Sequence, residues 1–233
     1  RMGGEKTFSD EFNTFTCCVG TGMENHAKYG ESIFFQSPDS KTLFVNLFIP
    51  ATLNWEDQHT KVQLASSILQ TDTVTINMEN QKAASFQVKL RKPSWSKGYT
   101  LLINGKKTNS SVDANGFVTF SKKWSNRDQI QYILDREIHA EPMIDNKDRV
   151  AIFYGPVLLA GLLGDSTPDP VMGIPVLLTD DHNARHWIQP VDKENMVFKT
   201  VGVGKPFDVS LKPFYSVYKQ HYMVYWDLFT NSA

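Results

Sequence analysis

Residues 99–120 read YTLLINGKKTNSSVDANGFVTF, and this stretch indicates the fold class of most of the chain. Residues 99–103 and 116–120 are short runs rich in aromatic, β-branched and other apolar side chains, and the sequence from residue 40 onward has a period close to two, as in β-strands. Asn104-Gly105 is a strong signal for a two-residue type I′ hairpin, and Asn115-Gly116 predicts a second turn of that kind. We therefore expect antiparallel β-structure here.

The period of two continues on both sides of this stretch. Strand-like runs on its two sides are 42–49 (TLFVNLFI), 61–68 (KVQLASSI), 73–78 (TVTINM), 85–90 (SFQVKL) and 129–134 (QIQYIL). Their spacing is close to that of an all-β sandwich. After a loop-like boundary at 136–148, further runs are 149–163 (broken at Gly155-Pro156), 196–201, 207–211 and 222–229, with an irregular proline-rich loop at 164–186. The chain is therefore predicted to be mainly β, with two β-sandwich domains.

One short helix is expected before the strands, over residues 21–34. Thr21 and Glu24 have the spacing of a capping box, with Thr21 as the N-cap. Met23 and Phe34 fall on one helical face, and we expect both to pack in a core.

Composition excludes several classes of protein. The 233 residues carry 24 basic and 25 acidic side chains, a net charge of −1, which argues against a nucleic-acid partner. Apolar residues make up 41%, enough for a sizeable core, but no apolar run approaches the roughly 20 residues of a membrane helix. We expect no membrane partner, and residues 1–6 show no apolar signal region, so the compartment stays unknown.

The segment with most potential for chemistry is 16–26 (TCCVGTGMENH), which holds the two cysteines of the chain. Cys17 and Cys18 are adjacent, so their Cα atoms are about 3.8 Å apart, too close for an ordinary disulfide. A thiol near a helix N-terminus has a lowered pKa, and adjacent thiolates can bind a soft cation such as Zn²⁺, which normally takes four ligands. The residue types leave open whether the pair is a buried structural feature or a metal or nucleophile site.

This segment closely resembles one in the β-L-arabinofuranosidase family of glycoside hydrolases, formerly catalogued as a domain of unknown function. Four later stretches resemble the same family in the same order: 43–49 (LFVNLFI), 90–95 (LRKPSW), 150–160 (VAIFYGPVLLA), and 213–215 (PFY) through 222–226 (YMVYW). The double-cysteine segment is the specific one, and the others are mainly structural.

The resemblance implies an architecture and a site. The family has an N-terminal (α/α)₆ catalytic barrel followed by β-sandwiches, so residues 1–38 would be the end of the barrel, 39–138 one sandwich and 139–233 a second. Cys17 matches the nucleophile, which forms a glycosyl-thioether, and also a zinc ligand, while Cys18 matches a second zinc ligand. The remaining ligands, from a Glu-x-Cys motif, and the general acid/base Glu lie upstream in the family.

The chain departs from that pattern because it contains no Glu-x-Cys motif and no third cysteine. We therefore expect it to be the C-terminal fragment of a retaining, zinc- and cysteine-dependent enzyme, inactive and without stoichiometric zinc by itself. Its expected partners are the missing barrel and glycans containing L-arabinose, and a periplasmic or extracellular location would fit the family. The alternative is a stand-alone carbohydrate-binding or structural β-sandwich module with inert cysteines.

Other candidate residues favour structural roles. Glu24 and Glu31 could form a carboxylate pair on one helix face, but a solvated face is the preferred interpretation.

The cluster Asp180, Asp181, His182 and His186 could bind a metal, although the loop looks non-helical and polar surface is favoured. The five tryptophans could stack on sugars, with core or rim packing favoured: Trp55, Trp95, Trp124, Trp187 and Trp226. A cysteine-protease site at Cys17 and a phosphate loop at 20–22 lack further support.

Overall fold

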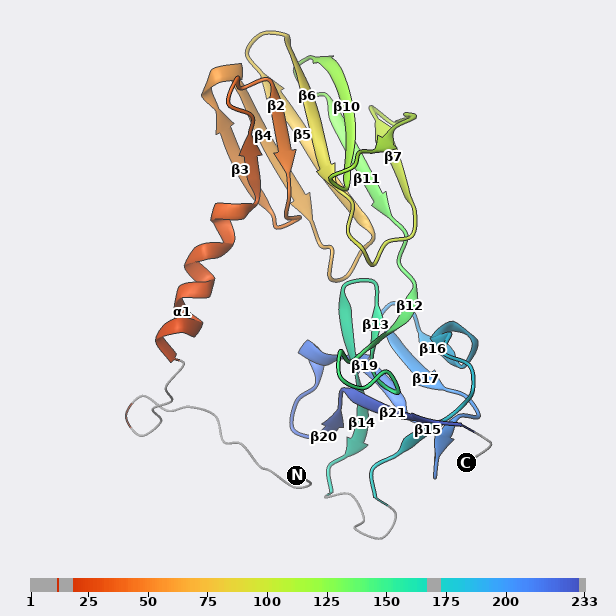
Figure 1. The fold of residues 1–233 in the computed structure, drawn as a ribbon. Helices are drawn as coiled ribbons and strands as arrows, with labels where there is room; N and C mark the ends of the chain where they lie inside the picture. The colour runs from red at the N-terminus through yellow and green to blue at the C-terminus, as the bar shows by residue number, and fades with distance from the viewer. Residues whose placement is uncertain (1–11, 13–18, 167–172, 231–233) are drawn as a thin grey trace. The chain divides into compact units, whose positions relative to one another are not determined.

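The computed structural model describes residues 12, 19–166 and 173–230 (Figure 1). These residues are mainly β, as predicted, with one short α-helix. The chain divides into two compact units between Asp135 and Arg136, whereas the sequence pattern places the boundary near residue 139. Among the described residues, no helix is long and apolar enough to cross a membrane.

The N-terminal helix differs from the predicted one at both ends. Helix α1 (Val19–Lys28) is followed by a 3-10 turn (Tyr29–Ser32) and by strand β1 (Phe34–Gln36). Thr21 therefore lies inside the helix instead of capping it. The predicted core position of Met23 is wrong, because its side chain is 66% exposed. Phe34 does pack against the core, but from a strand, since pairing with β2 determines its conformation.

The first unit is a sandwich of two sheets. One sheet has the order β1-β2-β6-β10-β9 and the other the order β3-β4-β5-β11-β7-β8. All neighbouring pairs are antiparallel except β2 and β6, which are parallel. The strands are β2 (Thr42–Val45), β3 (Ala51–Trp55), β4 (Thr60–Ser66), β5 (Thr73–Asn80), β6 (Ala84–Arg91), β7 (Tyr99–Ile103), β8 (Lys106–Lys107), β9 (Ser111–Val112), β10 (Phe117–Trp124) and β11 (Gln129–Leu134).

In the longer strands, the predicted alternation places one face in the core. In β11, for example, buried and half-buried residues alternate along the whole strand. The side chains that are completely buried between the sheets include Leu43, Ile76, Met78, Leu90, Trp124, Ile130 and Tyr132. The sequence prediction omits strand β3, an edge strand, although Ala51, Leu53 and Trp55 alternate with polar residues along it.

The two Asn-Gly turns turn out to be different. Asn104 and Gly105 have φ values of 51° and 73° between β7 and β8, where Ile103 pairs with Lys106, as a two-residue type I′ hairpin requires. At the second turn only Gly116 has a positive φ, of 82°. There the Asp113 carboxylate accepts hydrogen bonds from the backbone N–H groups of Asn115 and Phe117, so the loop is longer and the type I′ prediction is wrong.

The second unit contains ten strands around a core of its own. Its sheet order is β16-β17-β19-β14-β13-β21-β15-β18, with β12 paired to β13 and β20 paired to β14. Core residues from seven of these strands form one buried cluster, so the strands enclose a single core as in a β-sandwich. The strands are β12 (Ile138–Pro142), β13 (Arg149–Tyr154), β14 (Val157–Gly164), β15 (Val176–Leu178), β16 (Ile188–Asp192), β17 (Val197–Thr200), β18 (Gly204–Lys205), β19 (Ser210–Pro213), β20 (His221–Met223) and β21 (Tyr225–Phe229).

Two segments predicted as loops contain strands. β12 lies in the predicted boundary loop, and β15 lies in the predicted irregular loop. Both are specified by their neighbours, since β12 pairs with β13 along its length and β15 pairs in parallel with β21. Such short strands carry too few residues to show a period of two in the sequence.

Candidate functional site

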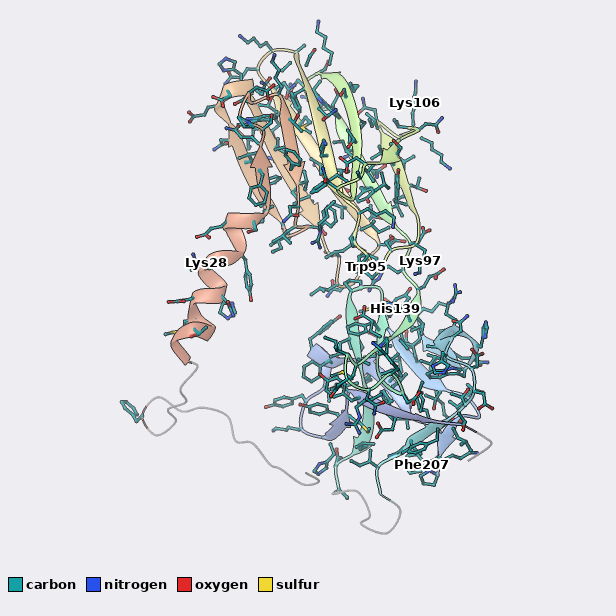
Figure 2. All side chains as sticks on the ribbon, viewed as in Figure 1. Lys28, Trp95, Lys97, Lys106, His139 and Phe207 are labelled. Carbon is teal, nitrogen blue, oxygen red and sulfur yellow. The ribbon has the colours of Figure 1, made fainter. Side chains whose placement is uncertain are left out.

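Cys17 and Cys18 lie outside the described residues, so the structure gives no geometry for the predicted nucleophile and zinc ligands. The nearest described element is α1, which begins at Val19, the residue after Cys18. Residues 20–28 of α1 are all exposed, and Figure 2 shows Lys28 on this helix. A helix of this length that contains Gly20 and Gly22 is marginal in water unless other residues cover it.

The two carboxylates near this helix are separate, solvated charges. Glu24 lies on α1 and Glu31 in the following 3-10 turn, and both are exposed. Glu31 forms an ion pair with Lys28 at 3.4 Å, with both side chains about two-thirds exposed. The structure therefore supports the solvated-face interpretation over a catalytic pair.

The acidic and histidine cluster of the proline-rich loop stabilises a turn. The carboxylate of Asp181 contacts Nδ1 of His186 at 2.6 Å, and the second ring nitrogen of His186 contacts the Asn183 amide. The backbone N–H of Asn183, followed by His186, lowers the pKa of Asp181. The main-chain oxygen of Asp181 accepts a hydrogen bond from the Trp187 indole at 2.9 Å. Within the described part of the chain, no group of three or more His, Cys, Asp or Glu residues is arranged to hold a metal.

The tryptophans are core residues, which was the favoured interpretation. Trp55, Trp124, Trp187 and Trp226 are each at most 4% exposed, and Trp95 is half-buried against the first core. They therefore offer little surface for stacking on a sugar. Three of the indoles donate hydrogen bonds, to Gln36, to the main chain of Phe86 and to the main chain of Asp181.

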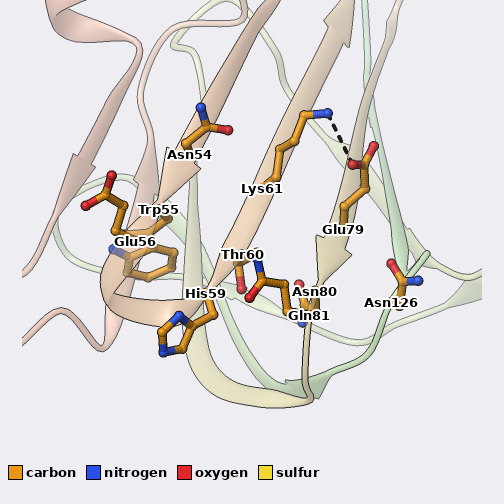
Figure 3. Close-up of a pocket in the computed structure, with 10 residues that line it drawn as sticks. All are labelled: Asn54, Trp55, Glu56, His59, Thr60, Lys61, Glu79, Asn80, Gln81 and Asn126. Atoms are coloured by element: carbon orange, nitrogen blue, oxygen red, sulfur yellow. Dashed lines mark hydrogen bonds and ion pairs between the residues drawn. The ribbon is translucent and has the colours of Figure 1, made fainter.

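A groove that sequence reasoning missed lies at one end of the first sandwich (Figure 3). Asn54, Lys61 and Glu79 are paired neighbours on β3, β4 and β5, and Trp55, Thr60 and Asn80 form the next row across the same strands. Successive rows point to opposite faces of a sheet, so in the first row Asn54 and Glu79 are exposed and Lys61 is half-buried, whereas the second row is buried.

Loops complete this groove and give it an amide-rich lining. Glu56 and His59 come from the β3–β4 connection, Gln81 from the β5–β6 turn and Asn126 from the β10–β11 turn. The groove has a volume of about 630 Å³. Lys61 and Glu79 form an ion pair across it at 3.2 Å. No sequence motif marks these residues, because they come together only when the strands pair.

The stretches that resemble the glycosidase family meet pairwise in space. Strand β2, from the first stretch, runs parallel to β6 with Val45 opposite Leu90 of the second. Strand β13, from the third, pairs with β21 of the fourth, with Val150 opposite Trp226. All four of these residues are buried, so the first pair of stretches lies in the core of the first unit and the second pair in the core of the second unit.

Comparison with known proteins supports this resemblance. Residues 42–136 match the model of the GH127 β-L-arabinofuranosidase middle domain. The predicted resemblance to this family is confirmed. Residues 163–228 match a second model, described as a domain of unknown function, which fits the former status of the family. No curated protein matches the chain in sequence.

Solved structures share the fold of this GH127-like chain. A GH127 β-L-arabinofuranosidase from Geobacillus stearothermophilus matches with a TM-score of 0.70 and 17% identity, over 91% of this chain and 37% of its own. A structure titled glycoside hydrolase matches with a TM-score of 0.68 and 15% identity, over 91% and 40%. A further GH127 β-arabinofuranosidase matches with a TM-score of 0.55 and 18% identity, over 81% and 35%. The chain thus spans about two-fifths or less of each of these proteins.

Proposed function

We propose that this chain is the C-terminal part of a retaining glycoside hydrolase that acts on glycans containing L-arabinose. The observation that carries the proposal is the GH127 middle-domain match over residues 42–136, within a fold shared along nearly the whole chain. In this proposal the two sandwiches support a helical catalytic barrel, and residues 1–38 are the last segment of that barrel.

The exposure of helix α1 is the structural argument that a barrel packs against this chain. Its residues 20–28 are all exposed, and its two glycines lower its helix propensity, so tertiary packing has to supply its stability. Neighbouring barrel helices would cover it. Because Cys18 immediately precedes this helix, covering α1 would also enclose the double-cysteine segment.

The donor set of Cys17 and Cys18 fits Zn²⁺, which prefers thiolate ligands, but it supplies two of the usual four. The Glu-x-Cys motif implied by the resemblance would supply the other two. Bound zinc would keep the thiols deprotonated at neutral pH. Cys17 would then attack the anomeric carbon through its sulfur, and a glutamic acid of the barrel would protonate the leaving oxygen. Water activated by the same glutamate would release the sugar with retained configuration.

Expression of two proteins tests this function: the 233-residue chain alone, and the same chain preceded by a barrel that carries Glu-x-Cys. We expect the longer protein to bind one zinc and to release sugar from an aryl β-L-arabinofuranoside, and the chain alone to do neither. The thiols of the chain alone should also react freely with an alkylating reagent. One tightly held zinc in the chain alone, or sugar release by it, would overturn the proposal.

The same pair of proteins distinguishes the alternative, a stand-alone carbohydrate-binding or structural module. That alternative predicts that Cys17 and Cys18 remain inert in the longer protein as well. Zinc analysis of the longer protein separates the two functions, because the enzyme needs the metal and the module does not.

A further inference from the structure

We propose that the groove at the end of the first sandwich binds a neutral oligosaccharide, at a site separate from the cysteine chemistry. This proposal is independent of the proposed function, because all residues that line the groove lie between Asn54 and Asn126. Its basis is the hydrogen-bonding character and the charge of the lining.

The lining is rich in groups that both donate and accept hydrogen bonds. Asn54, Asn80, Gln81 and Asn126 contribute side-chain amides, and Thr60 contributes a hydroxyl. An amide offers two donors and a carbonyl acceptor, and a sugar hydroxyl donates one hydrogen bond and accepts others. A cluster of amides therefore matches a row of neighbouring hydroxyls better than it matches an ion.

The charges of the groove exclude other ligands. Glu56 and Glu79 carry two negative charges and Lys61 one positive charge, and the lysine is already paired with Glu79 at 3.2 Å. This balance opposes phosphate groups, so nucleic acids and phosphorylated ligands are disfavoured. Peptides bind through pockets for side chains, whereas the large apolar residue here, Trp55, is 4% exposed and offers none.

Asn80 forms a fixed, buried wall beside the groove. Its side chain is 6% exposed, and its Nδ2 donates to the main-chain oxygen of Trp124 at 3.0 Å, which fixes the orientation of the amide. Its Oδ1 is buried and accepts no hydrogen bond from any described residue. Because this oxygen has almost no accessible surface, a ligand in the groove would meet the more exposed amides of Asn54, Gln81 and Asn126 instead.

The fold holds the groove in place. Thr60 donates to the main-chain oxygen of Gln58 at 2.9 Å, and the N–H of Gln81 donates to the main-chain oxygen of His59 at 3.3 Å. His59 adopts the left-handed conformation, with φ of 48°, at the end of a 3-10 turn. The polar rim is thus preorganised on paired strands, which reduces the entropy lost on binding.

Titration of the ¹⁵N-labelled 233-residue chain by NMR tests the proposal, with arabinotriose and cellotriose as neutral probes and galacturonic acid as the anionic control. We expect the neutral probes to shift the side-chain amide signals of Asn54, Gln81 and Asn126, with a Kd of roughly 1 mM. Galacturonic acid should bind more weakly, because Glu56 and Glu79 repel it.

Matched variants locate the binding. Gln81→Ala and Asn126→Ala should each weaken binding about fivefold, the cost of one lost hydrogen bond. Gln70→Ala and Asn109→Ala remove exposed amides outside the groove and should leave the Kd unchanged. The proposal is overturned if neither neutral probe shifts these signals at about 50 mM, if the groove variants bind like the controls, or if a tetra-alanine peptide binds there more tightly than the sugars. Failure of the enzymatic proposal would not alter these results, because no turnover is measured.

Discussion

Gly161 lies directly against the indole ring of Trp226, with no room between them for a side chain. A Cβ atom at Gly161 would lie 2.3 Å from Cζ2 and 2.4 Å from Cη2 of Trp226, and 3.0 Å from a methyl group of Val209. Trp226 is completely buried. Gly161 is on β14 and Trp226 on β21, the strands on either side of β13, so this contact fixes the packing of the second core.

Gly161→Ala should therefore destabilise the second unit by about 1–3 kcal/mol, because the added methyl group overpacks a filled core. Urea unfolding followed by tryptophan fluorescence measures the effect. Trp226→Phe removes the ring atoms that would clash, so the double variant should be more stable than the sum of the two single changes predicts. Additive effects would contradict the close contact.

Asn80→Ala should destabilise the first unit by about 1–3 kcal/mol, since the buried main-chain oxygen of Trp124 loses its donor. This hydrogen bond joins β5 of one sheet to β10 of the other, so its loss weakens the sandwich itself. Asn54→Ala, on the exposed face of the edge strand β3, is the control and should change stability by less than about 0.5 kcal/mol. Equal midpoints for the two variants in thermal unfolding would disprove the structural role of Asn80.

Asp113→Asn should flatten the dependence of stability on pH in the acid range. A hydrogen bond from Lys89, followed by one from the N–H of Phe117, lowers the pKa of Asp113 from 3.8 to about 2. Because the folded-state pKa is the lower one, the stabilisation is present above 3.8 and is lost as the pH falls towards 2. The variant should be less stable than the native chain at neutral pH, and the difference should shrink over that window.

Denaturation midpoints at several pH values measure this convergence. Asp72→Asn is the control in the same unit, because the carboxylate of Asp72 accepts a hydrogen bond from the Thr73 hydroxyl instead of from a lysine. A constant difference between native and Asp113→Asn chains from neutral pH down to about pH 2 would contradict the assignment.

In the barrel-containing enzyme, Cys17→Ser should lower turnover by roughly a thousandfold or more, because a neutral hydroxyl is a poorer nucleophile than a thiolate. Cys17→Ser and Cys18→Ser should both reduce zinc content, measured by elemental analysis. With a slow substrate, mass spectrometry of the native enzyme should find the sugar attached to the peptide that contains Cys17. A sugar attached to Glu24 would instead assign the nucleophile to that carboxylate.

The local sequence predicts those elements that carry their own signal. The strands around residues 99–134 have a clear period of two, and Asn104-Gly105 supplies the positive φ angles of its turn without help from the rest of the chain. The resemblance of the double-cysteine segment and the four later stretches is likewise a property of the sequence, and the GH127 match over residues 42–136 contains two of these stretches, 43–49 and 90–95.

Tertiary structure decides what depends on distant partners. Phe34 belongs to a strand because β2 pairs with it, although its spacing from Met23 is helical. Strands β12 and β15 form against β13 and β21, and their own residues give no period. The groove combines residues from three strands and three connections, so no stretch of sequence reveals it. The sequence by itself determines the mainly β class and the family resemblance, because periodicity and motifs are local. Pairing and burial determine the groove and the tryptophan cores, because the free energy of those contacts comes from residues far apart in the chain.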